Sequence, residues 1–319
     1  MSLPSRAPLL LRDLIDDLDE AMGLFLRNAP YTPLGGWYRP DNAQGEATRP
    51  MWFQKDWVHA DFSAEGAELF LWNERFMDAA REFYSAAEIV PRSVYVNLMI
   101  SLNESGPAHT DNPTFRGRDR TNTPMMLLRV MVASGLFDRW QIVQATSIWW
   151  MNDVEGGGFS YWAHGPGQGP ERHVGDMANT ALVGDNHGMY HQVEPVGPFL
   201  EKTPLVTPAA ELAPVAGGQG DWAVMDSGRE CFRAPFAELR ASVLWKADVY
   251  ADEAERLELA ADVISMDDVV RIFNADLARR GEDLRLDREG LENNAGVAEL
   301  AAIYPEPVPV GAGRSIFDL

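Results

Sequence analysis

The stretch SVYVNLMISL, residues 93–102, is the first of a series of short apolar runs that decides the fold class. Further runs rich in β-branched, aromatic or aliphatic residues, separated by Gly, Pro and Asn, follow at residues 124–132, 140–151, 158–164, 179–184 and 240–250. Short strands with turn residues between them predict an all-β barrel or sandwich rather than alternating βαβ units. No glycine-rich dinucleotide or P-loop signature accompanies them, which argues against nucleotide binding.

Helical patterns flank this β region on both sides. Apolar and acidic residues alternate with helical spacing over residues 8–28, and a second helix is predicted from a cap at Ser63 through residue 87. Ser265 opens a capping-box-like start, and Gly281 is a plausible helix end. We therefore expect mainly β structure with flanking helices: a helical and loop region (1–90), a β core (91–250) with an insertion loop (198–235), and a C-terminal helical region (251–319).

The composition restricts the class of protein. The 319 residues include 48 acidic and 27 basic ones, giving a formal charge of −21, whereas nucleic acids and anionic membranes are bound by clustered Lys and Arg. The single Cys231 excludes an intramolecular disulfide and a metal site built from several cysteines. Charges interrupt the N-terminal segment, and no window approaches the roughly 20 apolar residues of a membrane span. We expect a soluble, cytoplasmic protein.

Two polar clusters lie at the ends of predicted strands. His109 and Asp111 stand two apart in GPAHTDNPTF (106–115), so on a strand their side chains point to the same face. A surface loop with an Asp-initiated turn is the alternative. His191 lies 82 residues further on, in GDNHGMYHQVEPVG (184–197). Two imidazoles and one carboxylate on separate strands form the facial triad that holds Fe(II) and leaves coordination positions open.

Four motifs in this order resemble the Fe(II)- and 2-oxoglutarate-dependent oxygenases, a family with a double-stranded β-helix (jelly-roll) core. They are HTD (109–111), GGGFSYW (156–162), HQVEPV (191–196) and RASV (240–243). The resemblance implies that His109, Asp111 and His191 bind iron, and that 2-oxoglutarate and dioxygen are cosubstrates. It further implies oxidation of an unactivated C–H bond, usually hydroxylation, and we expect a small-molecule substrate because no peptide-binding repeat or basic groove is evident.

The same resemblance implies that Arg240 and Ser242 bind the distal carboxylate of 2-oxoglutarate, which a guanidinium fork fits in bidentate fashion. Arg240 lies 49 residues beyond His191, whereas the family's basic residue is commonly about ten beyond. Either an insertion separates the two strands, or Lys202 takes the role. The segment after Lys202 is a poor strand, so we favour Arg240.

Five further residues are candidates for contacts with cosubstrate or substrate. Tyr95 and Asn97 share one strand face and either contact the cosubstrate or are buried and satisfied by the backbone. Arg129 lies in an apolar run predicted to be a strand, where a charge needs a partner or a cavity. Arg116 either binds an anionic substrate or is an exposed charge. His187 packs near the metal strand or meets substrate, and the residue after it is Gly, so the zinc-protease motif is incomplete.

Two other functions fit the same pattern. One is a jelly-roll iron enzyme that does not use 2-oxoglutarate, and the other is a catalytically inactive jelly-roll binding protein. By the family resemblance, Asp111 fills the position that halogenating relatives leave free for chloride, so halogenation is disfavoured.

Overall fold

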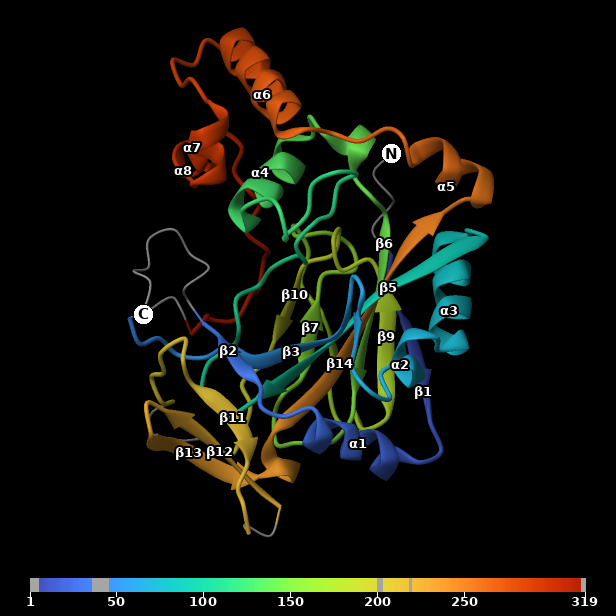
Figure 1. The fold of residues 1–319 in the computed structure, drawn as a ribbon, viewed down its shortest axis with the longest axis vertical. Helices are drawn as coiled ribbons and strands as arrows, with labels where there is room; N and C mark the ends of the chain where they lie inside the picture. The colour runs from blue at the N-terminus through green and yellow to red at the C-terminus, as the bar shows by residue number, and fades with distance from the viewer. Residues whose placement is uncertain (1–5, 36–45, 200–202, 218–219, 317–319) are drawn as a thin grey trace.

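Strands dominate the computed structural model, which describes residues 6–35, 46–199, 203–217 and 220–316 (Figure 1). The largest sheet is built from β1 (Leu9–Arg12), β2 (Thr32–Leu34), β3 (Trp52–His59), β4 (Phe62–Ser63), β5 (Glu88–Met99), β6 (Gln144–Trp150), β9 (Thr180–Gly184) and β14 (Arg240–Tyr250). Their order is β1-β9-β6-β14-β5-β3-β2, with β4 beside β3, and the pairings are antiparallel.

A second antiparallel sheet, in the order β10-β7-β8, consists of β7 (Phe159–Tyr161), β8 (Glu171–His173) and β10 (His191–Val193). From β5 to β14 the chain passes twice from the large sheet to this one, since β5 and β6 precede β7 and β8, and β9 precedes β10. Buried side chains from both sheets, such as Ile148 and Leu244 from one and Phe159 and Val193 from the other, form a shared apolar cluster. The space between the two sheets is therefore partly filled by core and partly left as the cavity described below.

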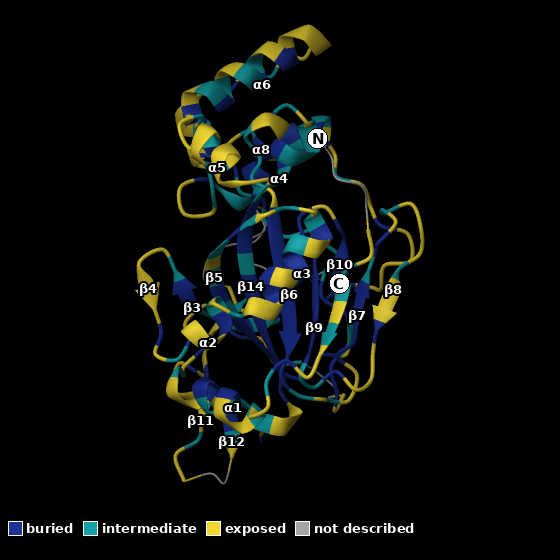
Figure 2. Cartoon of the chain, turned by 90° about the vertical axis from the view of Figure 1, so that its right-hand side faces the viewer, coloured by how far each residue is buried: buried dark blue, intermediate teal, exposed yellow. Residues whose placement is uncertain are grey.

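The large sheet is covered on both faces, and side chains of its central strand, β14, point alternately to one face and to the other. On β14, Ala241, Val243 and Trp245 belong to the main apolar core on the outer face, whereas Arg240 and Ser242 line the cavity on the inner face. The outer face is covered by α1 (Leu18–Arg27), α2 (Glu68–Leu71) and α3 (Glu74–Tyr84). Figure 2 shows the strands as the buried centre of the molecule, beneath helices with exposed outer faces.

A helical unit with a separate apolar core lies beyond one end of the sheets, at the top of Figure 1. It contains α4 (Met125–Ser134), α6 (Met266–Arg280), α7 (Arg288–Glu292) and α8 (Val297–Ile303), while α5 (Glu253–Leu259) follows β14 directly. The predicted start and end of α6 are confirmed. Ser265 and Asp268 form a capping box, and Gly281 is the left-handed C-cap with φ of 80°.

Several predicted elements are wrong in kind or extent. Residues 9–12 form a strand that pairs with β9, so the first helix begins only at Leu18. Ser63 lies in β4, and α3 is capped instead by Asn73, whose side chain accepts hydrogen bonds from two backbone N–H groups. The N-terminal region thus adds strands to the sheet besides its helices.

The run MMLLRVMVAS (125–134) is a helix rather than a strand. A short, continuously apolar run does not distinguish a buried strand from a buried helix by periodicity. Its boundaries do carry helix signals, since Pro124 precedes the first turn and Gly135 ends the helix in the left-handed conformation.

The predicted insertion loop contains regular structure of its own. Within the described part of residues 198–235, an antiparallel sheet is formed by β11 (Glu211–Pro214), β12 (Asp221–Asp226) and β13 (Arg229–Pro235). Trp222 from this small sheet packs into the main core. Among the helices that the structure describes, none combines the length and the apolar character needed to cross a bilayer.

Candidate active site

His109 and His191 lie directly opposite each other on neighbouring chain segments. The backbone N–H of His109 donates to His191 O over 3.0 Å, and that of His191 donates to His109 O over 2.8 Å. Residues that exchange both bonds in an antiparallel pair present their side chains on the same face. The two imidazole rings accordingly lie with their centroids 4.5 Å apart.

Backbone carbonyls fix the orientation of both imidazoles. His109 Nδ1 lies 2.8 Å from Pro107 O, and His191 Nδ1 lies 3.1 Å from Met189 O. A carbonyl oxygen only accepts, so Nδ1 carries a proton in both rings and Nε2 is the nitrogen left to face a metal ion. Burial and the neighbouring His191 lower the pKa of His109 to about 3, so this imidazole is neutral at physiological pH.

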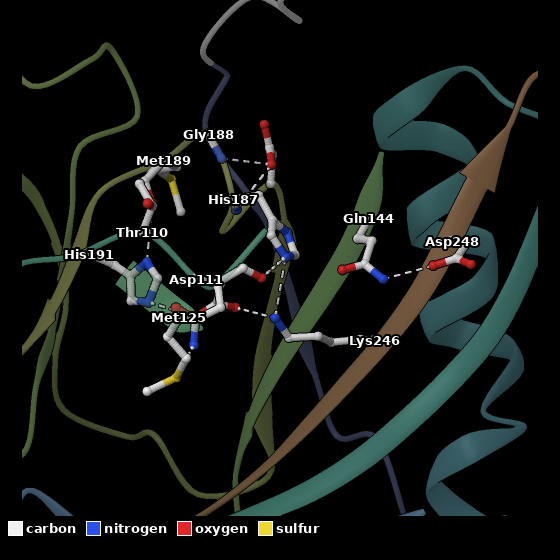
Figure 3. A network of polar contacts seen from close by, with 12 residues as sticks. Thr110, Asp111, Met125, Gln144, His187, Gly188, Met189, His191, Lys246 and Asp248 are labelled. Atoms are coloured by element: carbon white, nitrogen blue, oxygen red, sulfur yellow. Dashed lines mark hydrogen bonds and ion pairs between the residues drawn. The ribbon is translucent and has the colours of Figure 1, made fainter. Parts of the chain in front are cut away.

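Asp111 completes the group with its carboxylate. Its Oδ1 lies 3.5 Å from His191 Nε2, and its Oδ2 lies 2.8 Å from Lys246 Nζ (Figure 3). Burial alone would raise the pKa of Asp111, but the Lys246 ammonium and the imidazoles of His191 and His187 outweigh it and hold the pKa well below its usual range. The group is therefore ionised.

The three side chains are arranged as a metal-binding group. His109, Asp111 and His191 each offer one ligand atom, and these atoms lie within 4.8 Å of one another. Two imidazole nitrogens and one carboxylate oxygen form the donor set that suits a ferrous ion with open coordination positions. The residues present therefore fit the iron that the family resemblance implies.

The triad lines a cavity of about 1260 Å³ between the two sheets. The inner face of the large sheet forms one wall, and β7 and β10 form another. Helix α4 and the segment after α8 close the remaining sides, through residues that include Met125, Met126, Arg129, Tyr304, Glu306, Pro307 and Gly313.

Arg240 lines the same cavity with a buried cationic group. Its side chain is held by a 2.7 Å hydrogen bond from Nε to Gly157 O, and its guanidinium lies 5.7 Å from the centre of the Trp150 ring. Nη2 is buried and has no partner among the described residues. Burial lowers the pKa of Arg240 to about 9. A buried guanidinium without a counter-charge is costly and is suited to an anionic ligand.

Hydrogen-bonding side chains lie beside Arg240 on the inner face of the sheet. Ser242 pairs with Asn97 in register, and Asn97 pairs with Gln54. Gln54 Nε2 donates to Asn97 Oδ1 over 3.1 Å, which leaves the Asn97 amide nitrogen available to a ligand. Tyr95 lines the cavity two residues away, and burial together with Asp111 raises its pKa well above the usual value.

Arg129 and Arg116, which were both candidates for substrate contacts, lie in different surroundings. Arg129 lines the cavity from α4, where it is paired with Glu306 and donates to Thr110 O over 3.1 Å. Arg116 corrects our hypothesis of a substrate contact, because its side chain is 7% exposed, bonds to Asp262 Oδ2 over 2.9 Å and does not line the cavity.

His187 takes the packing role of the two considered for it. It lies beside the triad with Nε2 3.1 Å from Asn112 O, and it is absent from the cavity wall (Figure 3). Lys202, the alternative to Arg240, lies outside the described residues.

Sequence reasoning missed Lys246, which reaches Asp111 from the central strand. The sequence does indicate it, because Lys246 lies an even number of residues after Arg240 and Ser242 on the same strand, and its side chain therefore faces the same cavity. It also missed the chain segment after α8, whose place at the site depends on contacts far apart in sequence.

No model of a known family matches the sequence, and no curated protein matches it significantly. Among solved structures, a 2OG-Fe(II) oxygenase family oxidoreductase from Burkholderia pseudomallei is 12% identical, with a TM-score of 0.40 over 76% of this chain and 85% of that one. A prolyl-4-hydroxylase from Pseudomonas putida is 11% identical, with a TM-score of 0.37 over 78% and 94% of the two chains.

A third match is HygX from Streptomyces hygroscopicus, a structure described with nickel and 2-oxoglutarate bound. It is 8% identical, with a TM-score of 0.35 over 76% of this chain and 82% of that one. Likeness at this level does not carry a function, which has to come from the side chains. In its sequence motifs, and in the solved structures that it matches, the chain resembles the 2-oxoglutarate- and Fe(II)-dependent oxygenases.

Proposed function

We propose that this chain is an Fe(II)- and 2-oxoglutarate-dependent oxygenase that hydroxylates a C–H bond of a small molecule. One observation carries the proposal. A histidine–aspartate–histidine group whose Nδ1 atoms are bound to backbone carbonyls shares a cavity with a buried guanidinium, Arg240, that has no counter-charge among the described residues. A dianionic 2-oxo acid would suit this pair, because the triad would hold a metal ion for one end and Arg240 would hold the far carboxylate.

The alternation of the chain between two antiparallel sheets supports a double-stranded β-helix core. In this proposal residues 91–250 are the catalytic core, interrupted by the insertion at 198–235. Residues 1–90 and 251–319 are additions that extend the large sheet and close the cavity. The triad then lies at the point where His109 pairs with β10, between the two sheets.

In the proposed mechanism the protein positions groups and excludes water. His109, Asp111 and His191 would hold the iron, which when bound supplies the redox chemistry that activates dioxygen. Arg240 and Ser242 would hold the far carboxylate of 2-oxoglutarate, and the Asn97 amide would donate a further hydrogen bond. The carbonyls that accept from both Nδ1 atoms keep the imidazoles aimed at the metal position.

The cavity favours a large, uncharged and partly apolar substrate. Its volume of about 1260 Å³ is above the roughly 300–1,000 Å³ usual for small-molecule sites, which leaves room beside a cosubstrate. Apart from Arg240, its lysine and arginine side chains are each ion-paired, as Arg92–Asp248, Arg120–Asp56, Arg129–Glu306 and Lys246–Asp111. The walls are otherwise rich in aromatic and methionine side chains, among them Trp52, Trp72, Met125, Met126 and Tyr304.

Anaerobic titration tests the proposal. Adding Fe(II) and then 2-oxoglutarate to the protein should produce a weak visible charge-transfer band, and admission of air should release succinate. His109→Ala and Asp111→Ala should each abolish the band, because a ligand of the metal is lost. His164→Ala is the matched control, since His164 is an exposed histidine whose Nε2 lies 3.3 Å from Glu171, and it should leave the band unchanged.

The outcomes separate the alternatives. Iron binding without any response to 2-oxoglutarate would indicate an iron enzyme of another kind. Failure of the wild-type protein to bind Fe(II) would indicate an inactive binding protein, and a band that survives both alanine substitutions would refute the ligand assignment.

A further inference from the structure

Lys246 contacts the proposed ligand set from outside it. Its ammonium lies 2.8 Å from Asp111 Oδ2, and the two side chains are only 13% and 10% exposed (Figure 3). Lys246 is one of three lysines in a chain with 24 arginines. A lysine here is a compact point charge that contacts one oxygen, whereas an arginine fork would tend to engage both oxygens of a carboxylate.

The two oxygens of Asp111 have different neighbours. Oδ1 faces His191 Nε2 at 3.5 Å, on the side where the three ligand atoms gather, while Oδ2 accepts from the Lys246 ammonium. The ammonium thus holds Oδ2 on the side away from His191, and Oδ1 is the oxygen turned toward the other two ligand side chains. A carboxylate held in this way binds through one oxygen rather than two.

His187 does not compete for the ammonium. Its Nε2 lies 3.1 Å from Asn112 O and 3.5 Å from Lys246 Nζ. Since the carbonyl only accepts, Nε2 carries a proton and donates to Asn112, so it is not an acceptor for Lys246. Asp111 is left as the close partner of the ammonium.

The backbone of Lys246 is rigidly placed. On the central strand β14 it pairs with Ser93 of β5 on one side and with Thr146 of β6 on the other. Groups fixed on paired strands are positioned more precisely than groups on loops. Asp111, by contrast, lies in an irregular segment, tied to Asn186 O by its backbone N–H over 2.8 Å.

We propose that Lys246 is a positioning residue that keeps Asp111 a monodentate ligand and so preserves a coordination position that a chelating carboxylate would occupy. The proposal rests on the proposed function, because it needs the triad to bind a metal. Three ligand atoms leave three octahedral positions open, and a chelating 2-oxo acid with dioxygen would use them all. A second Asp111 oxygen on the metal would remove one of the three.

Cobalt(II) titration of the apoprotein tests this without relying on turnover. Lys246→Met removes the ammonium while keeping the length and apolar stem of the side chain. We expect its affinity for Co(II) to rise about 10-fold or more, because the variant loses a cation close to the metal position and gains a second carboxylate oxygen for the metal. We also expect its visible spectrum to change, since the freed carboxylate can rotate onto the metal, and 2-oxoglutarate to perturb that spectrum less than in the wild type.

Lys55→Met is the matched control. Lys55 lies on β3, its Nζ donates to Asn28 O over 2.6 Å and it does not line the cavity, so Co(II) affinity and spectrum should match the wild type. If Lys246→Met does not fold by circular dichroism, Lys246→Gln takes its place. It keeps a neutral donor but removes the cation, and it should still bind Co(II) several-fold more tightly than Lys55→Met.

Wild-type affinity and spectrum in the Lys246 variant that folds would overturn the role of Lys246 while leaving the metal site intact. Failure of the wild-type protein to bind Co(II) would instead reject the proposed function.

Discussion

At the residue scale, Arg240 is the side chain whose energetics point most directly to a ligand. It is 3% exposed, and its environment offers Gly157 O, the Trp150 ring and Met99 Sδ, but no carboxylate among the described residues. Removing a guanidinium from water costs several kcal/mol that only a well-placed anion offsets. Arg240 therefore carries a cost in the ligand-free protein that binding of an anion would relieve.

Arg240→Met should consequently change binding and stability in opposite directions. We expect the affinity for 2-oxoglutarate to fall about 100-fold or more, since losing one partner of a buried ion pair costs about 2–5 kcal/mol. The free energy of unfolding of the ligand-free protein should stay the same or rise, because an uncompensated buried charge is removed. Titration of the metal-loaded protein with 2-oxoglutarate and urea unfolding of the apoprotein measure the two effects.

Arg233→Met is the control for Arg240→Met, because Arg233 is an exposed strand arginine paired with Glu230. It should alter neither quantity appreciably. Wild-type affinity for 2-oxoglutarate in Arg240→Met would move the role to Lys202.

At the element scale, the start of α6 offers a clean test of local structure. Ser265 Oγ accepts from the Asp268 N–H over 3.1 Å, and the Asp268 carboxylate accepts from the Ser265 N–H over 3.3 Å. Ser265→Ala should lower the free energy of unfolding by about 1 kcal/mol, as for other lost N-caps. Ser63→Ala, at the exposed serine in β4 that only resembles a cap, should change it by less than about 0.5 kcal/mol. Equal losses in urea unfolding would contradict the capping assignment.

Elements whose signals are local could be predicted from the sequence, and those that depend on partners could not. The capping box of α6 and the alternation of side chains along β5 and β14 are local. The run at 125–134 is almost continuously apolar, so apart from Pro124 and Gly135 at its boundaries only its packing against the helical unit distinguishes it from a strand. The strand at 9–12 likewise forms because β9 offers an unpaired edge, which the first 30 residues do not reveal.

The residues of the candidate site likewise fall into those with a local sequence signal and those whose place depends on distant partners. The triad was predictable because its chemistry requires particular residue types at strand ends, and Arg240 because a family motif marks it. The ion pair between Arg129 and Glu306 was not, since it joins residues 177 apart in the chain. Arg116 was placed wrongly because nothing local indicates its partner Asp262, 146 residues away.

At the scale of the whole molecule, the last described segment returns to the cavity that holds the triad. Residues 305–316 follow the helical unit and line the cavity beside the triad. Gln192 holds this segment by donating from Nε2 to Gly313 O and accepting from Gly313 N–H, each over 2.8 Å. Trp162 Nε1 donates to Val310 O over 2.8 Å. The β core and the helical unit are thus joined at the cavity itself.

Gln192→Leu should loosen residues 305–316 and also the backbone at Gly106, because Gln192 Nε2 donates to Gly106 O over 2.8 Å as well. Gln192 follows His191 on β10, and alternation along the strand turns its side chain to the opposite face. Losing both bonds to Gly313 should speed amide hydrogen exchange in 305–316, because exchange reports local opening, while amides of β5 and β14 keep their wild-type rates.

Glu306→Gln is the companion variant, since it breaks only the ion pair with Arg129 at the other end of the same segment. Its effect should centre on the amides around residue 306 and spare those around Gly313. If both variants left exchange in 305–316 at wild-type rates, this wall of the cavity would be held by its apolar contacts alone. If exchange rose in β14 as well, the segment and the core would open as one cooperative unit.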